Sequence, residues 1–214
     1  MKTLNKKILT SIGTAIGVVI ILVVVIGFQI SLNNGNEPEQ LSFSYVETNQ
    51  DLKKALETQN ISMSSPLRLK GEAIEQYCNF FSNDSLQNTI EYCTSTELLD
   101  SEGKYLGNIH MVGSMTAPRF VMGVIQVSPT LDHLDTAKIV YQTMIETLVC
   151  KCWNEEKPGG FDSIPAWVDA ANSHHLEAKK ITSKSEITGL AHKGLLLEIT
   201  TNTEGYLWKF VVPN

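Results

Sequence analysis

An uncharged and strongly apolar run near the amino terminus, residues 8–30, constrains this chain more than any other feature. Its most polar side chain is Gln29, and the rest are aliphatic, aromatic, glycine, serine or threonine. Because an α-helix rises 1.5 Å per residue, about 20 such residues cross the roughly 30 Å hydrocarbon core of a bilayer. The run therefore predicts a single N-terminal transmembrane helix that contacts the lipid bilayer.

The charges on either side of this run predict its orientation. Residues 1–7 contain three lysines and no acid, whereas residues 31–40 contain two glutamates and no base. Basic residues close to a membrane span stay on the cytoplasmic side. We therefore expect a single-pass protein of the cell membrane with a basic cytoplasmic terminus, a linker at 31–40, and residues 41–214 as a domain outside the cytoplasm.

A cleavable signal peptide is the main alternative to a retained anchor, because it begins with the same kind of basic segment. Its apolar core usually spans about 7–15 residues and ends at small residues of the A-x-A type. The run here is longer, and residues 27–31, GFQIS, contain no such cleavage site. The sequence therefore favours a signal-anchor, with cleavage as the alternative.

Beyond the linker, the pattern of apolar residues predicts one α+β domain. Alternation with a period of two indicates strands, and spacing of three and four indicates helices. Strands are expected at 41–48, 89–99, 104–115, 119–127, 181–188, 194–203 and 206–213, and helices at 50–59, 71–81, 128 to about 157, and 163 to about 178. Glycine-ended turns at 100–103 and 202–205 connect neighbouring strands. We therefore expect a mainly antiparallel sheet with two or more helices packed on it.

Charge and missing motifs narrow the function classes. Removing the +3 of the first seven residues from the formal charge of −6 leaves −9 for the rest of the chain. Nucleic-acid partners need basic patches, so this charge argues against them. The chain also lacks G-x-S-x-G, H-E-x-x-H and phosphate-binding glycine loops. We expect a non-enzymatic binding or assembly module without a cofactor, with another envelope protein or a small ligand as its partner.

Four cysteines, Cys78, Cys93, Cys150 and Cys152, are an even number, which favours disulfides in an oxidising compartment. If the helix beginning near 128 continued through Cys152, the side chains of Cys150 and Cys152 would diverge by about 200° and could not bond to each other. We therefore expect Cys78 and Cys93 to pair separately with Cys150 and Cys152. The alternative is a Cys78–Cys93 bridge with an open dithiol at Cys150 and Cys152.

The open dithiol supports a second function class. Two thiolates in a C-x-C pair bind soft metals such as copper or zinc and exchange disulfides, and His174 or His110 could complete a metal site. A helical wheel places His174 near the apolar side of its helix, so an ordinary core or rim position is the simpler interpretation. His110 lies on an expected strand beside methionines, which usually serve packing.

Overall fold

The structure, a computed structural model, describes residues 43–214. The expected basic terminus at 1–7, the membrane anchor at 8–30 and the linker at 31–40 lie outside the described residues. Within 43–214, no helix is both long enough and apolar enough to cross a membrane. Residues 41–214 form a compact unit of their own.

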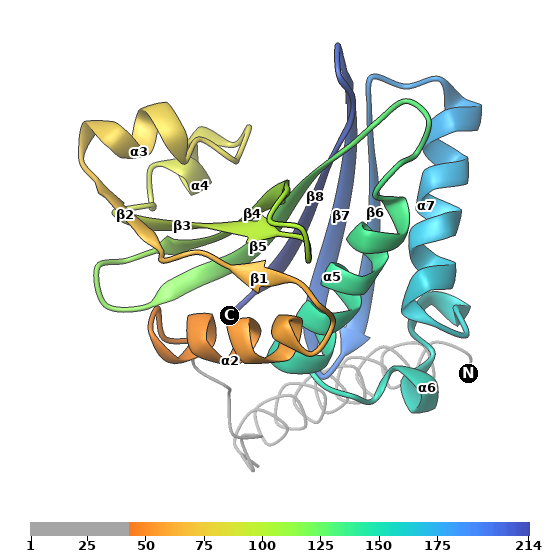
Figure 1. Cartoon of the computed structure of the whole chain (residues 1–214), viewed down its shortest axis with the longest axis horizontal. Helices are drawn as coiled ribbons and strands as arrows, with labels where there is room; N and C mark the ends of the chain where they lie inside the picture. Colours follow the sequence, from red (N-terminus) through yellow and green to blue (C-terminus); the bar gives the residue numbers. More distant parts are fainter. Residues whose placement is uncertain (1–42) are drawn as a thin grey trace, which may run out of the picture. The chain divides into compact units, whose positions relative to one another are not determined.

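The described residues form an α+β domain with an antiparallel sheet and several helices (Figure 1). In chain order the elements are α2 (Glu47–Glu57), β1 (Ser62–Met63), β2 (Leu67–Lys70), α3 (Glu72–Tyr77), α4 (Asp84–Gln87), β3 (Tyr92–Leu99), β4 (Tyr105–Gly113), β5 (Pro118–Val127), α5 (Leu134–Leu148), α6 (Trp153–Glu156), the 3-10 helix η1 (Pro158–Gly160), α7 (Ile164–Ala178), β6 (Thr182–Leu190), β7 (Lys193–Asn202) and β8 (Gly205–Pro213). This fold class confirms the α+β prediction.

The sheet joins two antiparallel meanders, one made of β3, β4 and β5 and the other of β6, β7 and β8. Its strand order is β1-β3-β4-β5-β8-β7-β6, and β2 also pairs with β3. The meanders meet at β5 and β8, which pair antiparallel from Phe120 opposite Pro213 to Val127 opposite Tyr206. Strands that are far apart in the sequence therefore lie side by side at the centre of the sheet.

One face of the sheet carries the main core, under α2, α5 and α7. Its largest buried side chains include Tyr141 on α5, Trp167 on α7, and Trp208 and Phe210 on β8. The Tyr141 hydroxyl donates to the Trp208 carbonyl at 3.2 Å, which satisfies its buried O–H. Gly123 on β5 gives α5 room, because a Cβ there would lie 2.8 Å from the Met144 sulfur. We call this side the helix face.

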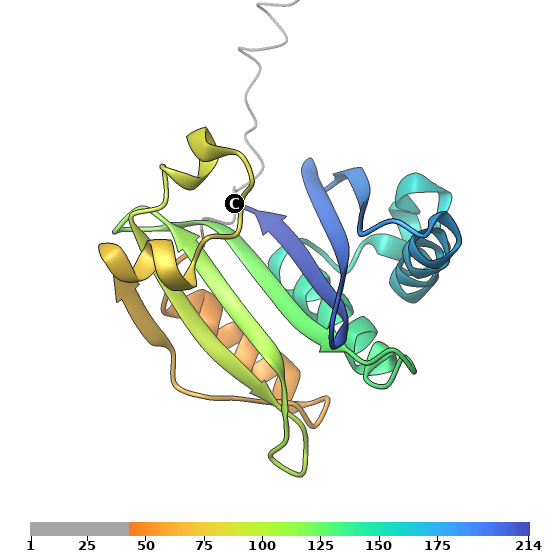
Figure 2. The same cartoon turned by 90° about the horizontal axis from the view of Figure 1, so that it is seen from above.

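The opposite face has a smaller core under α3 and α4 (Figure 2). Side chains alternate between the two sides of a strand, so every second residue of β3, β4 and β5 points here. This smaller core contains Leu69, Ile74, Cys78, Ile90, Cys93, Val112, Met122 and Val211. β5 contributes buried residues to both cores, so this strand is covered on both faces. We call this side the disulfide face.

The expected strand at 41–48 is wrong over its described part, because the chain turns into α2. The Ser44 hydroxyl accepts the Glu47 amide at 3.0 Å, and Ser44 also hydrogen-bonds the Glu47 carboxylate at 3.0 Å. Ser44 therefore satisfies an amide at the start of α2, while its own amide donates to the Thr48 hydroxyl at 3.2 Å. The expected helix at 50–59 begins earlier, and Asn49 lies inside α2 and is buried. The alternation of apolar and polar residues in 41–48 suggested a strand, although the sequence also contains a helix-capping residue at Ser44.

The long helix expected from 128 to about 157 is shorter at both ends, because α5 spans only Leu134–Leu148. Leu131 and His133 adopt left-handed conformations, with φ of 64° and 69°, so the helix begins after them. At the other end Val149 leaves helical geometry, with φ −123° and ψ −76°. The apolar stripe of α5 is as expected through Leu148, but Cys152 does not belong to it.

Candidate functional site

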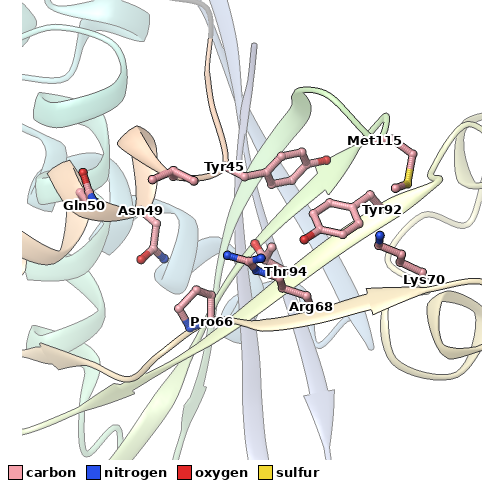
Figure 3. A pocket seen from close by; sticks show the side chains of 10 residues that line it. Tyr45, Asn49, Gln50, Pro66, Arg68, Lys70, Tyr92, Thr94 and Met115 are labelled. Atoms are coloured by element: carbon pink, nitrogen blue, oxygen red, sulfur yellow. The ribbon is translucent and has the colours of Figure 1, made fainter.

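A groove of about 370 Å³ opens on the helix face, between the start of α2 and strands β2 and β3 (Figure 3). We call it the α2–β2 groove. Aromatic and apolar side chains make most of its walls, namely Tyr45, Val46, Pro66, Tyr92 and Met115, and its polar side chains are Asn49, Gln50, Arg68, Lys70 and Thr94. It therefore combines an apolar lining with two cations.

Strand register brings the polar groups of the groove together. β2 pairs antiparallel with β3, so that Arg68 lies opposite Thr94 and Lys70 opposite Tyr92. Residues directly opposite each other project from the same face, and so do residues two apart. All four side chains therefore point to the helix face, where the first turn of α2 closes the other side of the groove.

Two tyrosines make a rigid aromatic wall. The rings of Tyr45 and Tyr92 meet edge to face with centroids 4.7 Å apart, and the Tyr45 hydroxyl donates to the Ser114 carbonyl at 2.8 Å. Burial, together with Tyr92 and the Glu91 carboxylate, raises the pKa of Tyr45 well above its ordinary value. Tyr45 is therefore a neutral hydrogen-bond donor at physiological pH.

The two cations of the groove form no ion pair with any described residue. The Lys70 ammonium lies 5.4 Å from the centroid of the Tyr92 ring, a cation–π distance. Arg68 is exposed beside it. The chain has a net negative charge, but Arg68 and Lys70 line the groove without an ion-pair partner among the described residues. Their side chains therefore add positive charge at this place, which is opposite in sign to the net charge of the chain. Such positive charge attracts an anionic group.

Thr94 supplies the one buried hydroxyl of the groove. The residue is only 2% exposed, and its Oγ1 has no hydrogen-bond partner. The next threonine on the same face of β3, Thr96, accepts a hydrogen bond from Asn49 Nδ2 at 3.1 Å. A buried hydroxyl left without a partner costs about 1–3 kcal/mol. The Thr94 hydroxyl therefore has no partner within the fold, whereas the Thr96 hydroxyl accepts from Asn49.

The side chains that line the groove offer several kinds of contact to a ligand. The described residues that line it include no histidine, cysteine or carboxylate that could act as a general base or nucleophile. They offer a guanidinium, an ammonium, a buried hydroxyl and two aromatic rings. A guanidinium binds a carboxylate through two parallel hydrogen bonds, and aromatic walls hold an apolar group beside it.

The expected pairing of the four cysteines is wrong, because they form two separate local disulfides. Cys78 bonds to Cys93, with Cα atoms 6.5 Å apart, and Cys150 bonds to Cys152, with Cα atoms 5.2 Å apart. The first pair lies on the disulfide face and the second packs against the core of the helix face, so cross-pairing would have to pass through the sheet. Because α5 ends at Leu148, Cys150 and Cys152 do not have the helical geometry that would separate their side chains.

The two disulfides differ in how much they stabilise the fold. In the chain-entropy account, a closed loop of about 15 residues contributes about 3 kcal/mol, and a loop of three residues about half of that. Cys78 and Cys93 are separated by 15 positions, whereas Cys150 and Cys152 are separated by only 2. The Cys78–Cys93 disulfide ties α3 to β3, while the Cys150–Cys152 disulfide closes a short loop after α5.

His110 lies within the smaller core rather than at an open site. Its ring packs on Phe80 with centroids 4.5 Å apart, and Nδ1 has no hydrogen-bond partner. Burial lowers the pKa of His110 to about 4. His110 is on the disulfide face, and Cys150 and Cys152 pack on the other, so the structure does not bring these candidate metal ligands together.

His174 is exposed on α7, and its neighbour His175 is the buried histidine, 2% exposed. The two ring nitrogens of His175 hydrogen-bond the hydroxyls of Ser183, at 2.8 Å, and Thr201, at 2.9 Å. The buried positions of α7 are Ile164, Trp167, Val168, Ala171, Asn172 and His175, which follow alternating steps of three and one. Extending that spacing from Trp167 would have selected His175 from the sequence.

Within 43–214, no three histidine, cysteine or acidic side chains are placed to hold a metal ion together. The sequence did not predict the α2–β2 groove, because the groove depends on β2, a four-residue strand whose alternation is too short to detect. The hydrogen bond from the Glu47 amide to the Ser44 hydroxyl is a local feature at the start of its α2 wall. In comparisons with protein-family models, curated proteins and solved structures, nothing matches this chain.

Proposed function

We propose that this chain is a membrane-anchored, non-enzymatic binding module whose α2–β2 groove holds a carboxylate-bearing segment of an extracytoplasmic protein partner. The apolar run at 8–30 and its basic flank support the anchor and its orientation. The acidic charge of the rest of the chain supports a partner other than nucleic acid.

The observation that carries the proposal is that two cations without an ion pair in the described domain line the same groove as a buried hydroxyl without a partner. Arg68 and Lys70 lie across the β2–β3 pair from Thr94 and Tyr92. A carboxylate in the groove would gain charge-assisted hydrogen bonds and would give Thr94 Oγ1 an acceptor.

The aromatic and apolar walls favour a peptide over a bare anion. Tyr45 and Tyr92 offer ring surface, and Met115 is 49% exposed at the rim. An acidic peptide with an apolar neighbour to the carboxylate would use both the cations and the walls. A small inorganic anion would use only the cations.

The groove also lies early in the chain. Its wall residue Tyr45 follows the linker at 31–40 within five positions. With the anchor retained, only a short stretch of sequence separates the apolar run at 8–30 from Tyr45. The partner is therefore expected among envelope proteins close to the membrane surface.

Chemical-shift mapping tests the site. The fragment 36–214, which contains the whole compact unit, is titrated with the peptide acetyl-Glu-Leu-Glu-Leu-amide and, as a control, with acetyl-Lys-Leu-Lys-Leu-amide. We expect the acidic peptide to shift the amide resonances of Arg68, Lys70 and Thr94, and the basic peptide to leave them in place. Shifts that spread over the surface, or that occur equally with both peptides, would contradict the proposed groove.

A further inference from the structure

We propose that the Cys150–Cys152 disulfide is a thiol–disulfide exchange site that accepts two electrons from the dithiol of a partner protein, while Cys78–Cys93 remains closed. This activity is independent of peptide binding in the α2–β2 groove. It rests on the contrast between the two disulfides and on the way that α5 ends.

Access is the first difference between the pairs. Cys78 and Cys93 are completely buried in the smaller core, whereas Cys150 and Cys152 are both partly exposed at the edge of the main core. Exchange requires a thiolate to reach a sulfur of the disulfide. A partner can therefore reach Cys150–Cys152 in the folded protein, but Cys78–Cys93 only after α3 has moved away.

The second difference is what each disulfide holds. Cys78–Cys93 connects the end of α3 to β3. Cys150–Cys152 lies within the single connection between α5 and α6, so opening it detaches no element from the core. The fold can therefore persist in both redox states of this pair, which a reversible exchange site requires.

Closure of Cys150–Cys152 is coupled to the end of α5. In a continuous helix two residues apart differ by about 200°, too far for the Cβ separation of about 3.5–4.5 Å that a disulfide needs. The disulfide and a helix through Cys152 are therefore mutually exclusive. Reduction removes this constraint and allows α5 to extend beyond Leu148, where the turn now has the Cys150 amide donating to the Ile145 carbonyl.

Charged groups of both signs lie close to the pair in the chain. Lys151 lies between the two cysteines and is exposed, so it adds one positive charge beside the sulfurs that react. The carboxylates of Glu155 and Glu156 follow on α6, one turn further along the chain. Lys151 is thus the charged group between the reacting sulfurs.

The exchange balances without any further reagent. A partner thiolate attacks one sulfur of Cys150–Cys152, the S–S bond breaks, and the other cysteine leaves as a thiolate that takes up a proton. The second partner thiol loses its proton and attacks the mixed disulfide, which releases the first cysteine. The chain gains two electrons and two protons as a dithiol, and the partner becomes a disulfide.

Graded reduction of the full chain in detergent micelles tests the proposal. The protein is incubated with increasing dithiothreitol, quenched, alkylated and analysed by peptide mass spectrometry. We expect Cys150 and Cys152 to become alkylated together while Cys78 and Cys93 stay bonded and the near-UV circular dichroism of the fold is kept. Opening of both disulfides together, opening of Cys78–Cys93 first, or reduction only on unfolding would each overturn the proposal.

A dithiol peptide then tests electron transfer itself. We expect the oxidised chain to convert a synthetic peptide with two cysteines to its disulfide, in amounts equal to the Cys150–Cys152 pairs lost, and to lose this ability in a Cys150→Ser, Cys152→Ser variant. Amide hydrogen exchange over 149–153 should slow on reduction of the wild-type chain, as α5 extends. An oxidising activity that survives in the double variant, or unchanged amide exchange, would contradict the inference.

Discussion

Arg68 and Thr94 face each other across the β2–β3 pair on the helix face, the first exposed without an ion pair and the second buried with an unpartnered hydroxyl. The fold therefore leaves a cation and a hydrogen-bond donor unsatisfied next to each other. Groups that only stabilise a fold are usually paired, as Asn49 and Thr96 are. Among residues 43–214, His110 Nδ1 and Trp208 Nε1 in the sheet are also without a partner, and what sets Thr94 apart is that it lines a groove beside two cations.

Replacing Thr94 separates binding from stability. In Thr94→Val the shape is kept and an unpartnered hydroxyl is lost, so we expect the free energy of unfolding to stay the same or rise by about 1 kcal/mol. The affinity for the acidic peptide should fall in the same variant. Urea denaturation and peptide titration measure the two effects.

Thr96→Val is the matched control on the same strand. It removes the acceptor of the Asn49 side chain, so we expect it to lower the free energy of unfolding by about 1–2 kcal/mol. Peptide affinity should stay unchanged in this variant once it is folded. If Thr94→Val were the more destabilising of the two, the account of the groove would be wrong about its hydroxyl.

His110 makes the domain sensitive to acid. Burial lowers the pKa of its imidazole from 6.5 to about 4, so the unfolded chain binds the proton more tightly than the folded one. The contribution of neutral His110 to the free energy of unfolding is complete above about pH 6.5 and is lost as the pH falls towards 4. The loss is about 2 kcal/mol already at pH 5. We expect His110→Leu to remove most of this difference between pH 7 and pH 5 in urea titrations.

The histidine pair on α7 gives a second matched comparison. His175→Ala removes the partner of both Ser183 and Thr201 and leaves a cavity, so we expect a loss of about 2–4 kcal/mol in the free energy of unfolding. His174→Ala, at an exposed position, should change it by less than about 0.5 kcal/mol. Equal effects of the two substitutions in thermal or urea denaturation would contradict the buried role of His175.

Membrane attachment is tested on the intact chain. A reporter fused after Asn214 should be active outside the cytoplasm and inactive inside it, and the chain should remain with membranes after a high-salt wash. A variant in which the three lysines of residues 1–7 are replaced by glutamate should lose this orientation bias. Release of the wild-type chain by salt would contradict the anchor.

The sequence predicted the elements whose periodic patterns are long. The strands β6, β7 and β8 and the helix α7 lie close to the ranges expected from the sequence. In these segments the alternation of apolar residues and the cap at Ser163 agree with the packing of the fold. The Ser163 hydroxyl accepts the Ala166 amide at 3.2 Å. Local and tertiary preferences coincide in these segments.

The candidate site depends on features that local patterns do not encode. β2 is too short for a periodic signal, and its side chains become a site only through the register with β3. The cysteine pairing failed because the end of α5 is set by the backbone at Val149, which the apolar stripe does not indicate. A small error in the assumed rotation of a helix moves a residue between its buried and its exposed side. For this reason the helical wheel placed His174, and not His175, near the apolar side of α7.

The affinity of the acidic peptide for paired charge variants tests the central claim most directly. Isothermal titration compares the wild-type fragment with Arg68→Ala, Lys70→Ala and with Lys53→Ala, Lys54→Ala, which removes the same charge from exposed positions of α2 outside the groove. We predict that the first double variant loses about tenfold or more in affinity, as expected when charge-assisted hydrogen bonds of about 1.5–3 kcal/mol are lost, and that the second stays close to wild type. Equal losses in both variants, or none in the first, would contradict the α2–β2 groove as the binding site.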